Sequence, residues 1–291
     1  MRRLEHWVTA QEEGRTVKSL ALKALRLSAG QFSSLKFRHA ITVDGAPAFA
    51  ADRLRAGQVL AVMLDEPAAA IRPSPLSLSI PYRDQDYLIV DKPAPLPSLP
   101  SCHQEGATLQ NVLYAALDCP KEFVYRPVNR LDKGTSGLMV IARHAHAQRL
   151  MTQQLHTGSF IREYLAVTEG VPALSEGTID APIARLGTGA RRAVREDGLK
   201  SVTHYRVVGT QGQRALLRLR LETGRTHQIR VHLSHIGCPI AGDYLYGSEL
   251  AQLNGRFALH SAFLACTQPI TGRRIEITEP LPDALAALLK P

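Results

Sequence analysis

The feature that most constrains the fold is a run of five apolar residues, 138–142, inside the segment RPVNRLDKGTSGLMVIAR. A short apolar run that follows a glycine-bounded turn is typical of a buried strand. The polar turn before it holds one acid, Asp132, between two bases, Arg130 and Lys133. Loops held by a rigid strand often carry functional residues, but Asp is also a favoured residue in ordinary turns. The run therefore predicts a sheet and leaves two interpretations of Asp132 open.

The chain from residue 82 to residue 291 consists mainly of short strand patterns. The expected strands cover residues 87–92, 162–167, 201–208, 215–221, 257–265 and 274–278. The expected helices cover residues 108–117, 145–155 and 283–290, with a further helix capped by Thr226. Because helices do not alternate regularly with strands, a doubly wound parallel sheet is not expected. We predict an α+β domain with a mixed, mostly antiparallel central sheet and flanking helices.

A smaller α/β domain is expected over residues 1–66. Residues 17–25 and 31–38 have helical spacing of apolar residues, and strand patterns with turns follow at 41–45 and 54–62. The proline-rich stretch 67–81 has no periodicity, as expected of an extended linker.

The charge of the chain favours a polyanionic partner. The net charge is +9, and a basic domain is the electrostatic footprint of nucleic-acid binding. Residues 1–60 hold ten Lys or Arg and five Asp or Glu, so more than half of the excess lies in this fifth of the chain. We expect Lys18, Lys36 and Arg38 to contact RNA phosphates; the alternative is a solvated basic face.

Composition excludes several classes of protein. No apolar run approaches the roughly 18 residues of a membrane span, and the N-terminal stretch has no apolar core of a secretory signal. The four cysteines are far apart, without a Cys-x-x-Cys pair, as expected of reduced thiols in a cytoplasmic protein.

Two motifs carry a family resemblance. The first is R-L-D-x-x-T-S-G followed by the apolar strand, and the second is G-R-T-H-Q-I-R-x-H at 224–232 followed by P-I-x-G-D-x-x-Y-G at 239–247. Together they resemble the signatures of the RluA-type pseudouridine synthases, which isomerise uridine to pseudouridine in structured RNA. The resemblance covers residues 87–282 and departs from the common pattern at Asn129, Gly134 and Leu199.

The resemblance implies an active site without metal or cofactor. Its catalytic residue would be Asp132, paired with Arg230, while Tyr164 would stack on the target base. Arg130 would occupy the place of the flipped base. The remaining residues expected to contact RNA near the site are Lys133, Arg225, His227 and Gln228. Residues 1–66 are similar to the alpha-L RNA-binding domain, although its pattern usually opens with Arg-Leu-Asp, and here residues 15–17 read Arg-Thr-Val.

The chemistry of the reaction is consistent with these residues. Breaking a glycosidic bond requires a carboxylate near the anomeric carbon, and a neighbouring cation keeps a buried carboxyl ionised. A ring beside the acid would support a flipped base, although without Asp132 a core residue would be the better interpretation of Tyr164. Asp132 could add to the base, attack the sugar or remove a sugar proton, and the sequence leaves all three routes open.

Two other functions remain to be weighed. One is a non-catalytic RNA-binding protein on the same fold. The other is a metal-dependent hydrolase that uses His227, His232 and His235, but no acid or cysteine cluster completes a metal site. The sequence favours a monomeric RNA pseudouridine synthase that acts on ribosomal RNA, with transfer RNA as the second candidate.

Overall fold

The computed structural model describes residues 2–64, 71–100, 106–155 and 157–290, and the chain divides into two compact units. Unit 1 comprises Met1–Ala70 with two short segments, Pro120–Val124 and His144–His146, and unit 2 comprises the rest. No helix in the described part of the chain is long and apolar enough to span a membrane.

Unit 1 contains a four-stranded antiparallel sheet in the order β1-β4-β2-β3 with two α-helices. Its elements are β1 (Arg2–Trp7), the 3-10 helix η1 (Ala10–Glu12), α1 (Val17–Lys23), α2 (Ala29–Phe37), β2 (Ile41–Val43), β3 (Ala46–Pro47) and β4 (Val59–Leu64). Thr16 caps α1 by accepting a hydrogen bond from the backbone N–H of Ser19. The two expected helices are confirmed, whereas β1 was not indicated by the sequence pattern.

Unit 2 contains a ten-stranded sheet, whose main path runs β10-β13-β14-β9-β15-β8-β6-β5. Its strands are β5 (Ser79–Arg83), β6 (Tyr87–Lys92), β7 (Arg126–Pro127), β8 (Ser136–Ala142), β9 (Ile161–Glu169), β10 (Glu176–Asp180), β13 (Val202–Gln211), β14 (Arg214–Leu221), β15 (Leu259–Thr267) and β16 (Arg274–Thr278). Among the described strand pairs of this sheet, β8 and β15 alone run parallel. The predicted mixed, mostly antiparallel sheet is confirmed.

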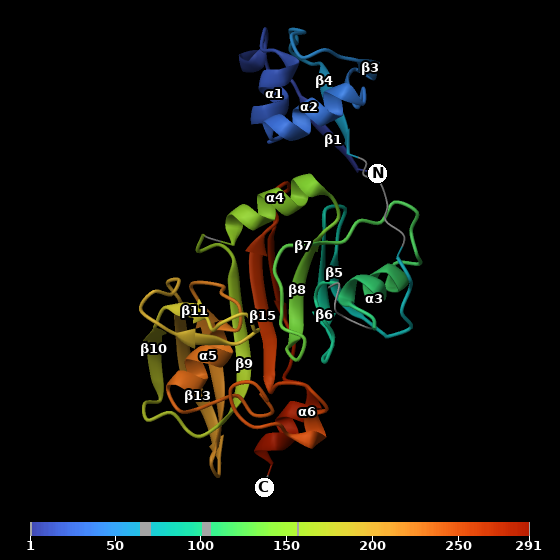
Figure 1. Ribbon diagram of the computed structural model, residues 1–291. Coiled ribbons are helices and arrows are strands. Elements are labelled where there is room, and N and C mark those ends of the chain that lie inside the picture. The colour runs from blue at the N-terminus through green and yellow to red at the C-terminus, as the bar shows by residue number, and fades with distance from the viewer. Residues whose placement is uncertain (1, 65–70, 101–105, 156, 291) are drawn as a thin grey trace. The chain divides into compact units, whose positions relative to one another are not determined.

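The apolar run of residues 138–142 lies at the centre of this sheet. All seven residues of β8 are buried, between β6 on one side and β15 on the other (Figure 1). Ala147 and Met151 from α4 (Ala145–Gln154) join the apolar side chains of β6 and β8 in one core cluster. The remaining helices of unit 2 are α3 (Leu109–Ala116), α5 (Gln228–His235), α6 (Asp283–Ala286) and the 3-10 helices η2 (Ala251–Leu253) and η3 (Ala287–Leu289).

Two segments outside the expected strands also form strands. Residues 79–81 of the expected linker are part of β5, which pairs with β6. The basic stretch 185–200 includes most of a separate hairpin, β11 (Ile183–Arg185) and β12 (Arg192–Val194). Proline and charge dominate the composition of these two segments, while their strand partners lie elsewhere in the chain.

The parallel contact between β8 and β15 requires a glycine at position 137. Gly137 has a φ of +112°, and a Cβ at this position would lie 2.4 Å from the carbonyl oxygen of Ser261 on β15. Both the left-handed backbone and the close approach exclude a side chain. Gly137 therefore sets how closely the strand after Asp132 approaches β15.

Replacing Gly137 by alanine is expected to destabilise the protein by about 2 kcal/mol or more, because overpacking and an unfavourable φ act together. Thermal unfolding of Gly137→Ala measures the effect. Gly209→Ala is the matched control, since Gly209 lies on β13 with no atom within 4 Å of an added Cβ. Equal midpoints for the two variants would contradict the close-packing argument.

Candidate active site

Asp132 lies in the loop that leads into β8, and this loop is fixed by hydrogen bonds to its backbone. The backbone N–H of Thr135 donates to the carbonyl oxygen of Asp132 at 3.1 Å. The Ser98 hydroxyl binds the backbone of Leu131, donating to its oxygen at 2.6 Å and accepting from its N–H at 3.1 Å. The Asp132 side chain is 27% exposed. A rigid loop thus presents a partly accessible carboxylate.

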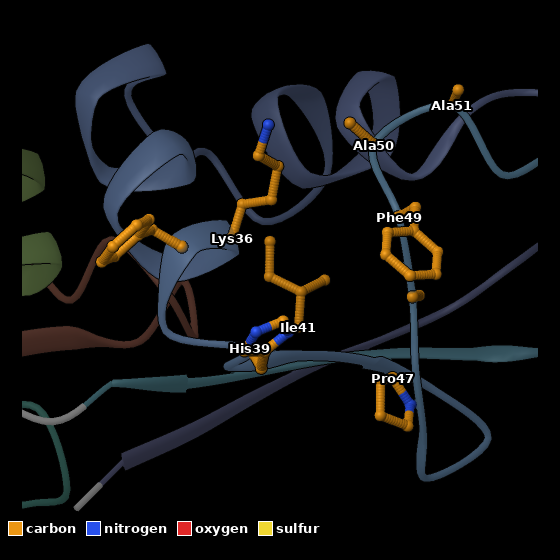
Figure 2. Close-up of a pocket in the computed structure, with 9 residues that line it drawn as sticks. Lys36, His39, Ile41, Pro47, Phe49, Ala50 and Ala51 are labelled. Carbon is orange, nitrogen blue, oxygen red and sulfur yellow. The ribbon is translucent and has the colours of Figure 1, made fainter.

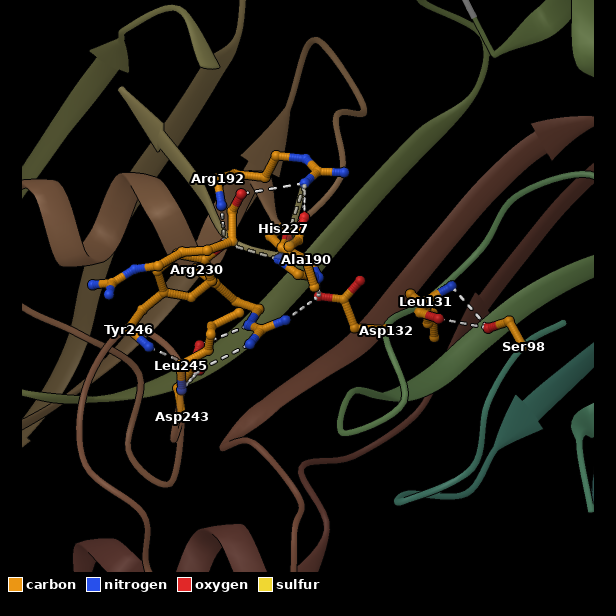
Figure 3. A network of polar contacts seen from close by, with 12 residues as sticks. Ser98, Leu131, Asp132, Ala190, Arg192, His227, Arg230, Asp243, Leu245 and Tyr246 are labelled. Atoms are coloured by element: carbon orange, nitrogen blue, oxygen red, sulfur yellow. Dashed lines mark hydrogen bonds and ion pairs between the residues drawn. The ribbon is translucent and has the colours of Figure 1, made fainter. Parts of the chain in front are cut away.

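Arg230 contacts this carboxylate from α5. Its side chain is only 3% exposed, and its Nη1 lies 2.9 Å from Oδ2 of Asp132. The expected ion pair is therefore present in the structure. The other oxygen of Asp132, Oδ1, accepts no hydrogen bond from the described part of the chain (Figure 3).

A second acid holds the far side of the same guanidinium. Arg230 donates from Nε to Oδ2 of Asp243 at 2.7 Å and from Nη2 to Oδ1 at 2.9 Å. Asp243 is fully buried and also accepts from the backbone N–H groups of Leu245 and Tyr246. This two-bond geometry fixes the plane of the guanidinium. Asp243 thereby determines which nitrogen of Arg230 faces Asp132.

Aromatic rings surround the same cation. The guanidinium carbon of Arg230 lies 4.0 Å from the ring centre of Phe257 and 5.0 Å from that of Tyr246. Rings at this distance attract a cation and exclude water from it. Two acids and two rings thus compensate for the burial of this charge.

His227 completes the polar network around Asp132. It precedes α5 in the left-handed region, with φ 59°, so the helix does not begin at the expected Thr226. Nδ1 lies 2.8 Å from the Tyr246 hydroxyl, and Nε2 lies 4.0 Å from Oδ2 of Asp132. Burial lowers the pKa of His227 below its usual value, although the charge of Asp132 acts in the opposite direction. The imidazole is therefore neutral at pH 7.

Tyr164 lies on β9, with a side chain that is almost fully buried. Its register partners are Leu219 on β14 and Ser261 on β15. Burial raises the pKa of the Tyr164 hydroxyl, and the charge of Asp132 raises it further. The phenol is thus protonated and lies within electrostatic reach of the acid.

Lys92 is a buried cation that the sequence pattern did not single out. Its ammonium donates to the carbonyl oxygens of Leu96 at 2.7 Å and Pro93 at 3.0 Å, with that of Lys133 at 3.4 Å. Burial lowers the pKa of Lys92 to about 7, and the charge of Asp132 opposes this effect. Lys92 ties the end of β6 to the backbone that follows Asp132.

The chain is similar to known proteins over most of its length. Residues 86–235 match the family model described as RNA pseudouridylate synthase. The chain belongs to the RluA-type RNA pseudouridine synthases. The ribosomal large subunit pseudouridine synthase D of Xanthomonas campestris is 40% identical over 85% of this chain and 79% of that protein. The protein of the same name from Pseudomonas aeruginosa is 39% identical over 86% of this chain and 82% of that protein.

A solved structure shows the same relationship. Human RNA pseudouridylate synthase domain containing 1 superposes with a TM-score of 0.58 at 28% identity, covering 70% of this chain and 83% of that one. The chain is accordingly an isomerase that converts uridine in RNA to pseudouridine. The predicted family and enzyme class are confirmed.

The structure divides the other residues expected to contact RNA into two groups. Arg130, Lys133 and Arg225 are exposed on unit 2, and Lys18, Lys36 and Arg38 are exposed on unit 1. Gln228 is buried, and its amide binds Val202, Thr203, Thr223 and Arg225 within the protein. Its side chain therefore holds α5 against β13 through hydrogen bonds within the protein.

The histidines of α5 do not form a metal site in the described residues, where no group of three or more potential ligands is placed to hold an ion. Nε2 of His232 donates to the carbonyl oxygen of Ala181, so Nδ1 accepts from the Thr203 hydroxyl, each at 2.9 Å. Both ring nitrogens are thus used to fasten α5. Thr203 in turn accepts from Gln228, which extends the same chain of hydrogen bonds.

The sequence reasoning missed Asp243, Tyr246 and Lys92 as members of the site. The first two belong to the P-I-x-G-D-x-x-Y-G motif, and Lys92 closes the strand before Pro93. A charged or aromatic residue inside such a motif was an available signal. The residue that each of them contacts could not be predicted, because contacts between distant segments are set by the tertiary structure.

Replacing Asp243 by asparagine is expected to cost roughly 3–5 kcal/mol of stability, because one partner of a buried ion pair is removed. Pseudouridine formation should fall as well, since Arg230 loses the contact that orients it toward Asp132. Urea unfolding and RNA isomerisation by Asp243→Asn measure the two effects. Asp197→Asn is the control, because Asp197 forms an exposed pair with Arg195 of little energetic value. Full activity in Asp243→Asn would refute the orienting role.

The imidazole of His227 is expected to titrate below its ordinary pKa of 6.5, because burial disfavours its charged form. The histidine resonances in an NMR titration, assigned with His227→Gln, measure this midpoint. Removing the negative charge in Asp132→Asn should lower the midpoint further. A midpoint that stays unchanged or rises in Asp132→Asn would show that the carboxylate does not raise the pKa of this ring.

Proposed function

We propose that the chain isomerises uridine in ribosomal RNA with Asp132 as its catalytic residue. One observation carries the assignment: Arg230 binds one oxygen of the carboxylate at 2.9 Å, while the other oxygen accepts no hydrogen bond from the described residues. A nucleophile or base needs such an uncommitted oxygen.

The neighbouring residues support this role by position. Asp243 holds Arg230, and Arg230 holds the carboxylate, so the acid keeps one direction while the uracil is detached, turned and rejoined through carbon. The protonated Tyr164 on β9 supplies an uncharged ring beside the acid, against which a flipped base would stack. Arg130 is exposed two residues before Asp132 and would occupy the place that the base leaves.

Ribosomal RNA is the favoured substrate for two reasons. Two relatives with about 40% identity carry names that specify the large ribosomal subunit. Unit 1 adds a basic module with Lys18, Lys36 and Arg38 exposed, whose charge suits a large folded RNA. We propose that this module is an RNA-binding domain of the alpha-L type and that the synthase acts as a monomer in the cytoplasm.

Asp132→Asn should abolish the reaction, with a loss of at least about 100-fold, because asparagine keeps the shape but provides no carboxylate. The measurement is pseudouridine mapping of total RNA from cells that lack the protein, complemented with wild type, Asp132→Asn or the exposed control Asp197→Asn. Wild type and the control should restore the mark at the same uridines in large-subunit ribosomal RNA.

The opposite outcomes are equally informative. Restoration by Asp132→Asn would remove the catalytic role from this residue. Sites confined to transfer RNA would overturn the substrate assignment and leave the chemistry intact. If no uridine depends on the protein, the non-catalytic RNA-binding interpretation replaces the proposal.

A further inference from the structure

Unit 1 has a pocket that has no part in the proposed reaction. The cavity has a volume of about 470 Å³ and lies between the end of α2 and the segment after β3 (Figure 2). This is within the range of roughly 300–1,000 Å³ typical of small-ligand sites. Its aromatic lining residues are Phe37 and Phe49, which are 84% and 68% exposed. Exposing two phenylalanine rings to water in this way is unfavourable compared with covering them by a ligand or partner.

The lining combines an apolar floor with positive charge. Ile41 is buried between Phe49 on one side and the chain segment that carries Lys36 and His39 on the other (Figure 2). The four other lining residues besides Phe37 are proline and alanine, so small side chains leave the space open. None of the nine lining residues is acidic. A flat ring beside a cation, with no carboxylate among the lining residues, matches a nucleobase with its phosphate.

The segment that carries Phe49 is fixed before any ligand binds. The backbone N–H of Phe49 donates to Oδ2 of Asp52 at 2.7 Å, and the N–H of Asp52 donates back to the Phe49 carbonyl at 3.1 Å. The N–H of Lys18 donates to the carbonyl oxygen of Ala50 at 3.1 Å, which fastens the same segment to the start of α1. A platform ordered in advance loses little entropy on binding.

We propose that this pocket binds one unpaired nucleotide of the RNA substrate, with its base stacked on Phe49 and its phosphate near Lys36. The proposal rests on the proposed function, because it assumes that unit 1 meets RNA. Charge argues for this occupant over an apolar peptide, since residues 1–60 hold ten basic and five acidic residues. A peptide that fills an apolar pocket has no need of the cation Lys36 in the lining.

The test uses the full-length protein and a six-nucleotide oligouridine RNA with 2-aminopurine at its third position. Stacking on an aromatic ring quenches the fluorescence of 2-aminopurine. Phe49→Ala should remove most of the quenching and weaken binding about 5- to 150-fold, the range expected for one stacked base. Phe49→Leu should behave like Phe49→Ala, since it keeps apolar volume without a flat ring, and Phe49→Trp should keep the affinity.

Trp7→Ala is the matched control, because Trp7 is 67% exposed in the same unit and does not line the pocket. It should bind as wild type does. Thermal midpoints measured on all variants report their folding, and Phe37→Ala provides a second probe of the pocket. Wild-type affinity in Phe49→Ala, or an equal loss in Trp7→Ala, would overturn the site and assign the exposed rings to another occupant, such as a protein.

The two proposals can fail separately, because the binding assay requires no turnover. A chain that forms pseudouridine but shows unchanged quenching in Phe49→Ala loses only the nucleotide pocket. A chain that forms no pseudouridine yet loses quenching in Phe49→Ala keeps the pocket and loses the proposed reaction.

Discussion

The buried guanidinium of Arg230 is the interaction on which the active site depends. It joins the loop before β8, helix α5 and the turn that carries Asp243. A buried cation is costly unless its hydrogen bonds and charge are matched, and here two carboxylates and two aromatic faces match it. Because its contacts come from three separate segments, the loop with Asp132, the turn with Asp243 and Tyr246, and Phe257, the site is complete only in the folded protein.

The fold brings these segments together by close backbone contacts and by polar fastening of α5. Gly137 allows β8 to approach β15, and Gly134 packs against the ring of Phe257, where an added Cβ would lie 2.9 Å from ring carbons. On the other side, the chain of hydrogen bonds through Gln228, Thr203 and His232 holds α5 against β13. These contacts hold the segments around the site in place, while the Asp132 carboxylate stays partly accessible.

The two units differ in how they place their charged residues. In unit 2 the buried Arg230 is paired with two carboxylates, which gives the Asp132 carboxylate a fixed direction. Unit 1 keeps Lys18, Lys36 and Arg38 exposed along with Phe49, which suits contact with a long polyanion that is recognised by shape and by its unpaired bases. Residues 1–60 carry five of the nine excess positive charges of the chain.

The sequence alone determined the central strand, the two helices of unit 1, the sheet class and the motif residues Asp132 and Arg230, which pair although they are 98 residues apart. Apolar periodicity and turn chemistry are properties of neighbouring residues, so they can be read locally. Tertiary structure decided the partners: β1 and β5 as strands, the left-handed turn at His227, the burial of Gln228 and the hold of Asp243 on Arg230. The physical reason is that burial of a polar group is favourable only when distant segments supply its hydrogen bonds, and no local pattern records which segments those will be.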